Sequence, residues 1–489
     1  MIWTALLLFH VALILFLILS GRSRSKREPP LDKGIIPWLG HALDFGRDAS
    51  KFLAKMKMKH GDIFTVRVAG LYVTALLDPN SYDAVLQDSV TLDFTRYAQV
   101  LMERIFRLSL PSHNASAEKA LMRRHFQGES LTCLNSIMKG NLQSLLLRSE
   151  TPQDRENWKQ DGLFNFCYSL LFRAGYLTLF GAEKNNPNRD SSAIYEEFRK
   201  FDGLLTKMAR NTLSPEEKRT TSSVRQQLWS LLSLGLHGKK AEDMSWLQSY
   251  LQHLQEQGVD EEMQRRAMLL QVWATQGNVG PAAFWLLGFL LTNPDAMNAV
   301  KMEFNSLSWQ VDSPQHLPLD KLQNTPVFDS VLNETLRLTA APFITREVLH
   351  NTTLRMADGQ EYDIRRGDRV CLFPYLSPQM DPEIHKEPEK FKYDRFLNMD
   401  GSEKRDFYKG GKRLKYYTMP WGAGKNVCVG RHFAISSIKQ FVFTVLTCLD
   451  LELCDPDSSM PKVNASRYGF GVLQPMGDLQ MRYKLKGTF

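Results

Sequence analysis

The first apolar segment of the chain is distinguished from later ones by its length and by how few polar residues interrupt it. It is apolar from Ile2 to Leu19, interrupted only by Thr4 and His10. At a rise of 1.5 Å per residue, it can cross most of a bilayer. A cleaved signal peptide is the alternative, but it needs basic residues before the apolar segment and a small-residue cleavage site after it, and neither is evident. We therefore predict a transmembrane anchor over residues 1–20.

The next twenty residues are basic and then rich in proline. Cations on one side of a membrane span keep that side cytoplasmic, so the body of the protein is predicted to be cytosolic. Prolines lack a donor and fix φ, which predicts a stiff, non-helical connector. We predict a stop-transfer segment and hinge over residues 21–40 and a folded domain over residues 41–489. The charged residues of the connector are Arg22, Arg24, Lys26, Arg27 and Glu28, and its first prolines are Pro29 and Pro30.

The body alternates between two kinds of periodicity. From Asp62 to Asp78, apolar and polar residues alternate on both sides of Ala69-Gly70, which predicts a β-hairpin. From about residue 81 to residue 338 the period is helical, and several segments are apolar on more than one face, as in buried helices. A second group of strand and turn signals covers residues 342–374, and a last helix follows Cys428. The predicted fold class is mainly α with a small β subdomain.

Charge and cysteine usage narrow the range of partners. The net charge is +8, and residues 21–30 contribute +3 of it, as four cations less one anion. The basic excess therefore lies where anionic lipid headgroups would be, and nucleic-acid binding is not indicated. The six cysteines are scattered, without the spacing of a zinc site or the density of a disulfide scaffold. This usage fits a reducing compartment.

One cysteine has a distinctive setting. The segment "MPWGAGKNVCVGRHFA" places three glycines around Cys428, just before a predicted helix. Glycines allow a flat ligand to approach the backbone, and free N–H groups at the positive end of a helix lower the pKa of a thiol. The resulting thiolate could be a metal ligand or a nucleophile. A turn with an ordinary buried cysteine is the alternative interpretation.

A second candidate group contains charged residues only. Glu334 and Arg337 lie three apart in "ETLR", on one face of a helix, and Arg395 follows between aromatic residues in "FKYDRF". A surface ion pair is the simplest interpretation of the first two. The three residues become informative because they precede Cys428 in this order, near the C-terminal end of a chain of this length.

Together these motifs resemble the cytochrome P450 superfamily over essentially the whole chain. The resemblance implies that superfamily's fold, preceded by a single transmembrane helix, and a haem b cofactor whose iron takes Cys428 as its axial thiolate. It also implies a structural role for Glu334, Arg337 and Arg395. The anchor, basic stretch and hinge are similar to those of microsomal members. The expected location is the endoplasmic reticulum membrane, with residues 41–489 as a cytosolic haem-thiolate catalytic domain.

The loop departs from the superfamily's pattern at two positions. Trp421 replaces the usual Phe and still offers an aromatic face to the thiolate, and Asn426 replaces an Arg or His that would bind a haem propionate. Arg346 in "APFITREV" matches another propionate-binding position. Lys119 and Arg123, four apart on a predicted helix, are candidates for a further one, with a solvated basic face as the alternative.

The segment "WATQGNVGPAAFWLL" departs furthest from the superfamily's pattern. Monooxygenases of the superfamily read roughly A-G-x-[DE]-T here, and the acid and the alcohol relay protons to bound dioxygen. This chain has Gly277 in place of the acid and Asn278 in place of the alcohol. An amide is a fixed donor and acceptor rather than a titrating group, so it cannot serve as such a relay. The alternative for Asn278 is that it satisfies a helix bend caused by Pro281.

This departure favours a substrate that already contains an O–O bond. "LTAAPFITREV" and "SRYGFG" resemble superfamily members that isomerise the lipid endoperoxide prostaglandin H2 to prostacyclin by homolytic cleavage, without O2, NADPH or a reductase. The alternatives are a microsomal sterol hydroxylase, since these can carry Asn at the same position, and, more remotely, a non-catalytic haem sensor. By resemblance, Cys428 and Asn278 are the expected catalytic residues, and the expected substrate contacts are Asn278, Arg104, Leu110, Thr345, Arg346, Arg369 and Trp273.

Overall fold

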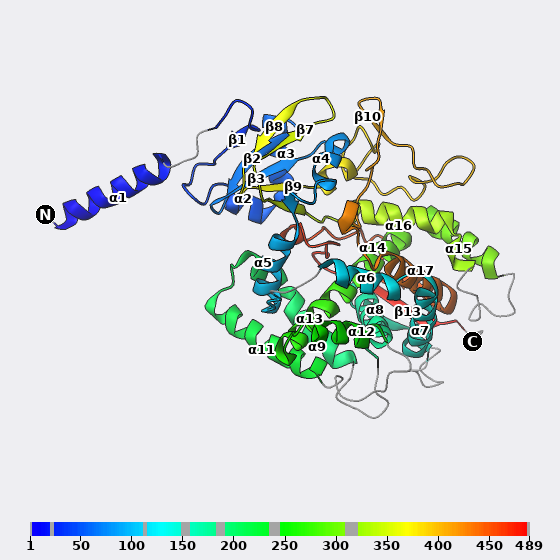
Figure 1. Ribbon diagram of the computed structural model, residues 1–489. Helices are drawn as coiled ribbons and strands as arrows, with labels where there is room; N and C mark the ends of the chain where they lie inside the picture. The colour runs from blue at the N-terminus through cyan, green and yellow to red at the C-terminus, as the bar shows by residue number, and fades with distance from the viewer. Residues whose placement is uncertain are drawn as a thin grey trace.

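The computed structural model describes residues 2–19, 24–110, 115–147, 157–181, 191–233, 245–308 and 321–486. Arg22, one of the four cations of the connector, lies outside these ranges. Strands β1, β2, β3, β7, β8 and β9 gather at one end of the body, and most helices, with β13 among them, lie at the other, while α1 projects from the strand-rich end (Figure 1). The arrangement of a large helical part with small sheets is the predicted one.

Helices make up most of the body. Two of them, α13 and α14, follow each other almost without interruption, and α17 begins three residues after Cys428. The helices are α1 (Ile2–Leu19), α2 (Ala42–Arg47), α3 (Ala49–His60), α4 (Asp83–Leu86), α5 (Thr95–Phe106), α6 (Ala115–His125), α7 (Gly128–Leu147), α8 (Leu163–Phe180), α9 (Ser191–Gly203), α10 (Leu205–Arg210), α11 (Pro215–Ser233), α12 (Trp246–Glu256), α13 (Glu261–Gln276), α14 (Val279–Thr292), α15 (Pro294–Ser308), α16 (Pro326–Thr339) and α17 (Arg431–Cys448).

The strands form one larger sheet and several small ones. The larger sheet has the order β1-β2-β3-β9-β6-β4, and the others are β12-β13-β5, β7-β8 and β10-β11. The strands are β1 (Leu31–Asp32), β2 (Ile63–Val68), β3 (Leu71–Leu76), β4 (Leu92–Asp93), β5 (Lys159–Gly162), β6 (Ile344–Val348), β7 (Thr352–Arg355), β8 (Glu361–Ile364), β9 (Arg369–Leu372), β10 (Tyr408–Lys409), β11 (Lys412–Arg413), β12 (Leu449–Leu453) and β13 (Gln480–Leu485).

The predicted hairpin is present. Strands β2 and β3 pair antiparallel, from Ile63 opposite Leu76 to Val68 opposite Leu71. The two residues between them, Ala69 and Gly70, have φ values of 48° and 79°. Positive φ at both central residues is what a two-residue turn needs to match the twist of its strands. A side chain at residue 70 would also collide with the indole of Trp38.

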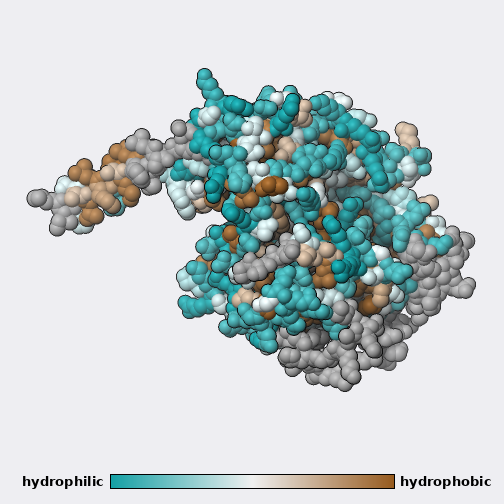
Figure 2. All heavy atoms as spheres, in the orientation of Figure 1, coloured by the Kyte–Doolittle hydropathy of each residue, from teal (hydrophilic) through white to brown (hydrophobic). Residues whose placement is uncertain are grey.

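Helix α1 exposes its apolar side chains from Trp3 to Leu15 and stands clear of the body (Figure 2). Among the described residues, one helix, Leu163–Phe180, is long and apolar enough to cross a membrane, but 67% of it is buried inside the protein. Within α1, the segment Trp3–Leu15 is a shorter apolar helix.

The connector after the anchor is bonded to the body. Strand β1 pairs parallel with β2, and the nearly buried Glu28 receives hydrogen bonds from the guanidinium of Arg365 at 2.9 and 2.5 Å. The carboxylate of Asp32 bonds His41 at 2.8 Å and Lys59 at 2.7 Å. Burial opposes ionisation of Asp32, but its hydrogen bonds outweigh burial and hold the pKa of this carboxyl well below its usual value.

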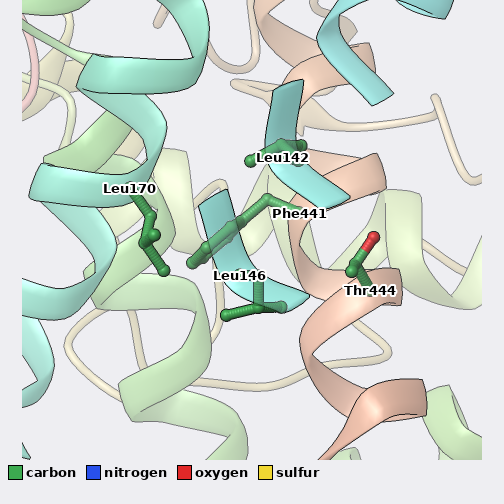
Figure 3. Close-up of a pocket in the computed structure, with 5 residues that line it drawn as sticks. All are labelled: Leu142, Leu146, Leu170, Phe441 and Thr444. Atoms are coloured by element: carbon green, nitrogen blue, oxygen red, sulfur yellow. The ribbon is translucent and has the colours of Figure 1, made fainter. Parts of the chain in front are cut away.

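The main hydrophobic core fills the helical part, and two smaller cores lie against the larger sheet. A small gap between helices α7, α8 and α17 has no room for a water molecule and is lined by Leu142, Leu146, Leu170, Phe441 and Thr444 (Figure 3). The hydroxyl of Thr444 donates within its own helix, to the carbonyl of Gln440 at 2.8 Å. This space is therefore an apolar packing gap and is no candidate for polar chemistry.

Candidate active site

Cys428 lies in a loop that ends at the N-terminus of α17. Its backbone N–H donates to the carbonyl of Trp421 at 2.9 Å, which closes the loop. Gly422 and Gly424 have φ values of 69° and 64°, and an added Cβ at either would lie 3.2 Å from a backbone oxygen. Glycine is therefore required at both positions to shape the loop. The cysteine side chain itself is exposed.

The acidity of Cys428 differs from the prediction. The backbone amides of Gly430 and Arg431 and the charge of Arg431 favour the thiolate, as expected at a helix N-terminus. Burial acts in the opposite direction and is the largest effect, so the pKa of the thiol is raised above its ordinary value. The helix amides thus act as predicted, but partial removal of the sulfur from solvent by the surrounding loop outweighs them in the polypeptide alone. A cation bound at the sulfur, such as a metal ion, would favour the thiolate.

Glu334, Arg337 and Arg395 form one buried ion-pair network. Glu334 and Arg337 are fully buried. Two guanidinium nitrogens of Arg337 donate to the two carboxylate oxygens of Glu334, at 2.7 and 2.9 Å. Arg395 Nε donates to the same two oxygens, each at 2.9 Å. The interpretation as a surface ion pair is therefore excluded.

Gln379 connects this network to the cysteine loop. Its side-chain amide donates to the carbonyls of Arg337 and Ala340 at 2.9 and 2.8 Å, and its side-chain oxygen accepts from the N–H of Met419 at 3.3 Å. Met419 lies two residues before Trp421. The network thus supports the segment that leads into the loop.

Three cations gather beside the cysteine loop. Lys119 donates to the carbonyl of Lys425 at 3.3 Å and to the side chain of Asn426. Burial, followed by the charges of Arg123 and Arg346, lowers the pKa of Lys119. Arg346 is 5% exposed and donates to the carbonyl of its neighbour Thr345 at 3.0 Å. Within the described residues none of the three cations forms an ion pair with a carboxylate.

The helix expected from Trp273 to Leu287 is broken in its middle. Helix α13 ends at Gln276 and α14 begins at Val279, with Gly277 and Asn278 between them. Pro281 has no N–H to donate to the carbonyl four residues earlier, which is that of Gly277. The hydroxyl of Tyr168 donates to this carbonyl instead, at 3.2 Å.

Asn278 is held by a segment that comes much later in the chain. Its side-chain oxygen accepts from the N–H of Val472 at 2.9 Å, and Gly471 lies so close that a Cβ there would be 2.3 Å from the same oxygen. A backbone N–H can only donate, so the amide oxygen must face Val472 and the NH2 group must face away from it. Within the described part of the chain this NH2 group has no acceptor.

Three of the expected substrate contacts lie on adjacent strands. Arg346 on β6 pairs with Val370 on β9, and Thr345 and Glu347 flank Arg346 opposite Cys371 and Arg369. The guanidinium of Arg369 lies 5.0 Å from the ring centre of Tyr97. Burial raises the pKa of Tyr97, while a hydrogen bond with Thr345 lowers it. The structure therefore brings Thr345 and Arg369 to one face of the strand pair, while the side chain of Arg346 points to the other face.

The other expected contacts lie apart from that strand pair. Leu110 is buried and belongs to the helical core, and Trp273 packs on Phe106 with ring centres 5.8 Å apart. Arg104 donates to the carbonyl of Ala209 at 3.1 Å, which ties α5 to the end of α10.

The cysteine loop and the buried Glu–Arg–Arg network are the parts of the sequence that resembled a known family, and the family comparison agrees. The cytochrome P450 family matches residues 29–481, and the chain belongs to this family. It is 54% identical to the prostacyclin synthase of Homo sapiens over 95% of each chain, and 54% identical to that of Rattus norvegicus over the same shares. It is also 43% identical to the 7-alpha-hydroxycholest-4-en-3-one 12-alpha-hydroxylase of Homo sapiens, over 97% of this chain and 96% of that one.

The family implies a haem-thiolate cofactor, and the residues present fit one. The Cys428 thiol is exposed and in no disulfide, so a ligand can reach it. Lys119 and Arg346 supply positive charge without a carboxylate partner, as two propionates would require. Lys119 bonds Asn426, so it delivers a charge to the position where the loop lacks the usual arginine.

Sequence reasoning missed three residues that hold the site together. Gln379 and Tyr168 act through backbone carbonyls, and Tyr97 lies under Arg369. None of them belongs to a motif. Tyr168 lies 109 residues before its partner Gly277, within an apolar helix where a tyrosine looks like an ordinary core residue.

Proposed function

We propose that this protein is a haem-thiolate isomerase that converts prostaglandin H2 to prostacyclin, with haem b bound through Cys428. The observation that carries the proposal is the Gly277–Asn278 turn, where a locked amide stands in place of an acid and an alcohol. Bound haem iron would supply the cleavage of the O–O bond. An isomerisation leaves the atoms of the substrate unchanged, so it needs neither dioxygen nor electrons from a reductase.

Asn278 orients the endoperoxide in this proposal. Its NH2 group is directed away from Val472 and can donate to an endoperoxide oxygen, while the bond to Val472 fixes the amide. The neighbouring hydroxyl of Thr275 donates to the carbonyl of Gln271 at 2.8 Å, so it is engaged within its own helix. The turn thus offers a fixed hydrogen-bond donor but no proton relay.

The proposed substrate site has a polar and an apolar side. Thr345 and Arg369, on one face of the strand pair, and Arg346, on the other, supply the polar contacts, where arginine suits the carboxylate of a fatty acid. Leu110 and Trp273 form the apolar side. We include Arg104 as a further contact, because only one of its guanidinium nitrogens is engaged within the described residues.

The same proposal places the protein on the endoplasmic reticulum membrane, with a single anchor and a cytosolic catalytic domain. The 18 residues of α1 span about 27 Å as a helix, close to the thickness of the hydrocarbon core. The connector then carries exposed apolar side chains, with Ile35 at 99% and Trp38 at 58% exposure, and Leu43, just after it in α2, is 63% exposed. We keep the division into anchor 1–20, connector 21–40 and catalytic domain 41–489.

A turnover assay tests the function. The purified haem-loaded protein is mixed with prostaglandin H2 alone, and in parallel with a P450 reductase and NADPH, and the products are identified by mass spectrometry. We expect equal prostacyclin formation in both. A strict requirement for reductase and NADPH would exclude the isomerase and favour a sterol hydroxylase, the activity named for the relative at 43% identity.

The role of Asn278 is tested with Asn278→Ala and Asn278→Thr in the same assay. Loss of a positioning hydrogen bond to substrate costs about 1–3 kcal/mol, so we expect kcat/KM to fall by roughly 5- to 100-fold. Full activity and an unchanged product distribution in both variants would show that Asn278 only supports the bend.

A further inference from the structure

The turn before α14 depends on a residue from another helix. Tyr168 on α8 is fully buried, and its hydroxyl donates to the Gly277 carbonyl that Pro281 leaves without a helical partner. Gly280 permits this approach, because a Cβ there would lie 2.4 Å from the Tyr168 ring and 2.7 Å from its Cα. Burial raises the pKa of the phenol well above its ordinary value, so the hydroxyl stays a donor.

The remaining contacts of Tyr168 fix the direction of its hydroxyl. Its ring packs against Phe164 and Tyr195, with centre distances of 5.5 and 5.8 Å, and the guanidinium of Arg199 lies 4.7 Å above its face. A ring enclosed on several sides has one orientation, so its single polar atom is aimed at Gly277.

We propose that Tyr168 is a positioning residue for the reaction: its bond to Gly277 fixes the turn and thereby aims the amide of Asn278 at the substrate. This inference rests on the proposed function, in which Asn278 donates to the endoperoxide. Two hydrogen bonds then fix the position of the donor, which is the NH2 group of Asn278. Val472 fixes the Asn278 side chain, and Tyr168 fixes the backbone immediately before it.

The test is a double-mutant cycle with Tyr168→Phe and Asn278→Ala, using prostaglandin H2 as the probe. We expect Tyr168→Phe to lower kcat/KM by about 5- to 10-fold and to raise the share of breakdown products other than prostacyclin. In the Asn278→Ala background it should change kcat/KM by less than about 2-fold, because the group it positions is gone. Equal effects in the two backgrounds would show a merely structural role.

A matched control separates the hydroxyl from the aromatic packing. Tyr195→Phe removes the same atom from the neighbouring ring, whose hydroxyl makes no bond to the turn within the described residues. We expect it to leave the kinetics and products unchanged. If Tyr168→Phe does not accumulate as folded protein, Gly280→Ala takes its place, since the new methyl group displaces the ring from Gly277. Wild-type product ratios in Gly280→Ala would overturn the proposal.

Amide hydrogen exchange tests the structural step independently of the reaction. Exchange over residues 273–282 should be faster in Tyr168→Phe than in wild type or Tyr195→Phe, because the buried Gly277 carbonyl loses its donor. The effect should disappear in a Pro281→Ala background, where residue 281 regains an N–H for that carbonyl. Unchanged exchange in Tyr168→Phe would overturn the proposal. If the wild-type protein fails to turn over prostaglandin H2, the proposed function fails, while this exchange result still decides the role of Tyr168.

Discussion

Two groups of cations lie on either side of the cysteine loop, and they differ in how their charges are satisfied. Arg337 and Arg395 direct their guanidinium groups to Glu334 and to backbone carbonyls, such as that of Gln379 at 2.7 Å. Lys119 and Arg346 find carbonyls and an amide, but no carboxylate within ion-pair distance among the described residues. The charges of the first group, Glu334, Arg337 and Arg395, are neutralised within the polypeptide, and we call it the complete group. Lys119, Arg123 and Arg346 have no carboxylate partner among the described residues, and we call them the incomplete group.

This difference separates structural charges from charges that bind a ligand. A buried ion is tolerated only when it is paired and fully hydrogen-bonded, so the complete group can be part of the core. Burial and the charges of Arg123 and Arg346 lower the pKa of Lys119, so an anion bound beside these cations would stabilise them. Glu334, Arg337 and Arg395 therefore belong to the fold, and we propose that Lys119, Arg123 and Arg346 bind the haem propionates.

The largest expected effect comes from breaking the complete group. Arg337→Ala leaves the buried carboxylate of Glu334 with one of its two arginine partners and the N–H of Lys392, and we expect the free energy of unfolding to fall by about 3–5 kcal/mol. Urea unfolding followed by circular dichroism measures this. Arg405→Ala, which breaks the exposed pair with Glu403, is the control and should cost less than about 1 kcal/mol. A small effect of Arg337→Ala would contradict the structural assignment.

The incomplete group should behave in the opposite way. Arg346→Met should leave the unfolding free energy of the haem-free protein within about 1 kcal/mol of wild type, because no carboxylate loses its partner. Loss of a charge-assisted hydrogen bond should weaken haem retention by roughly 10- to 100-fold. Transfer of haem to excess apomyoglobin measures retention. Arg123 is exposed, so Arg123→Ala should have a smaller effect that declines further at high salt. Unchanged haem transfer from Arg346→Met would remove Arg346 from the propionate site.

A smaller expected effect concerns how the stability of the complete group's surroundings depends on pH. His385 lies beside the complete group, is 1% exposed and bonds the carbonyl of Tyr417 at 2.9 Å. Burial lowers its pKa to about 3; the bond to Tyr417 opposes this, while Arg337 and Arg395 reinforce it. The unfolded chain protonates this histidine below about pH 6.5. Its contribution to stability is therefore present above that pH and is lost as the pH falls toward about 3.

The variant His385→Gln tests this linkage. Glutamine can still donate to the Tyr417 carbonyl but does not titrate. Between pH 7.5 and 5.5 the unfolding free energy of wild type should drop by about 1.4 kcal/mol more than that of the variant. Equal losses in the two proteins would show that His385 is already charged in the folded state.

The sequence predicted the features that depend on local pattern. The hairpin around Ala69-Gly70 and the interruption near Pro281 follow from turn chemistry and from a missing N–H, and both are present in the structure. Family resemblance predicted a shared structural role for Glu334, Arg337 and Arg395, and the structure brings the three side chains together.

The features that sequence reasoning missed depend on burial and on distant partners. The pKa of Cys428 is raised because burial outweighs the helix amides, and a motif does not reveal how much protein surrounds a sulfur. The bonds from Tyr168 to Gly277 and from Val472 to Asn278 join residues 109 and 194 positions apart. Neither partner is marked by charge or repetition, so only the folded chain shows them.

The most direct test of the account follows the oxygen atoms. Prostaglandin H2 is incubated with the haem-loaded protein, a P450 reductase and NADPH under isotopically heavy dioxygen, and the product is weighed by mass spectrometry. An isomerase that lacks a proton relay at Gly277 and Asn278 should give prostacyclin of unchanged mass, with no heavy oxygen. A product that has gained one heavy oxygen atom would contradict the account and identify the protein as a monooxygenase.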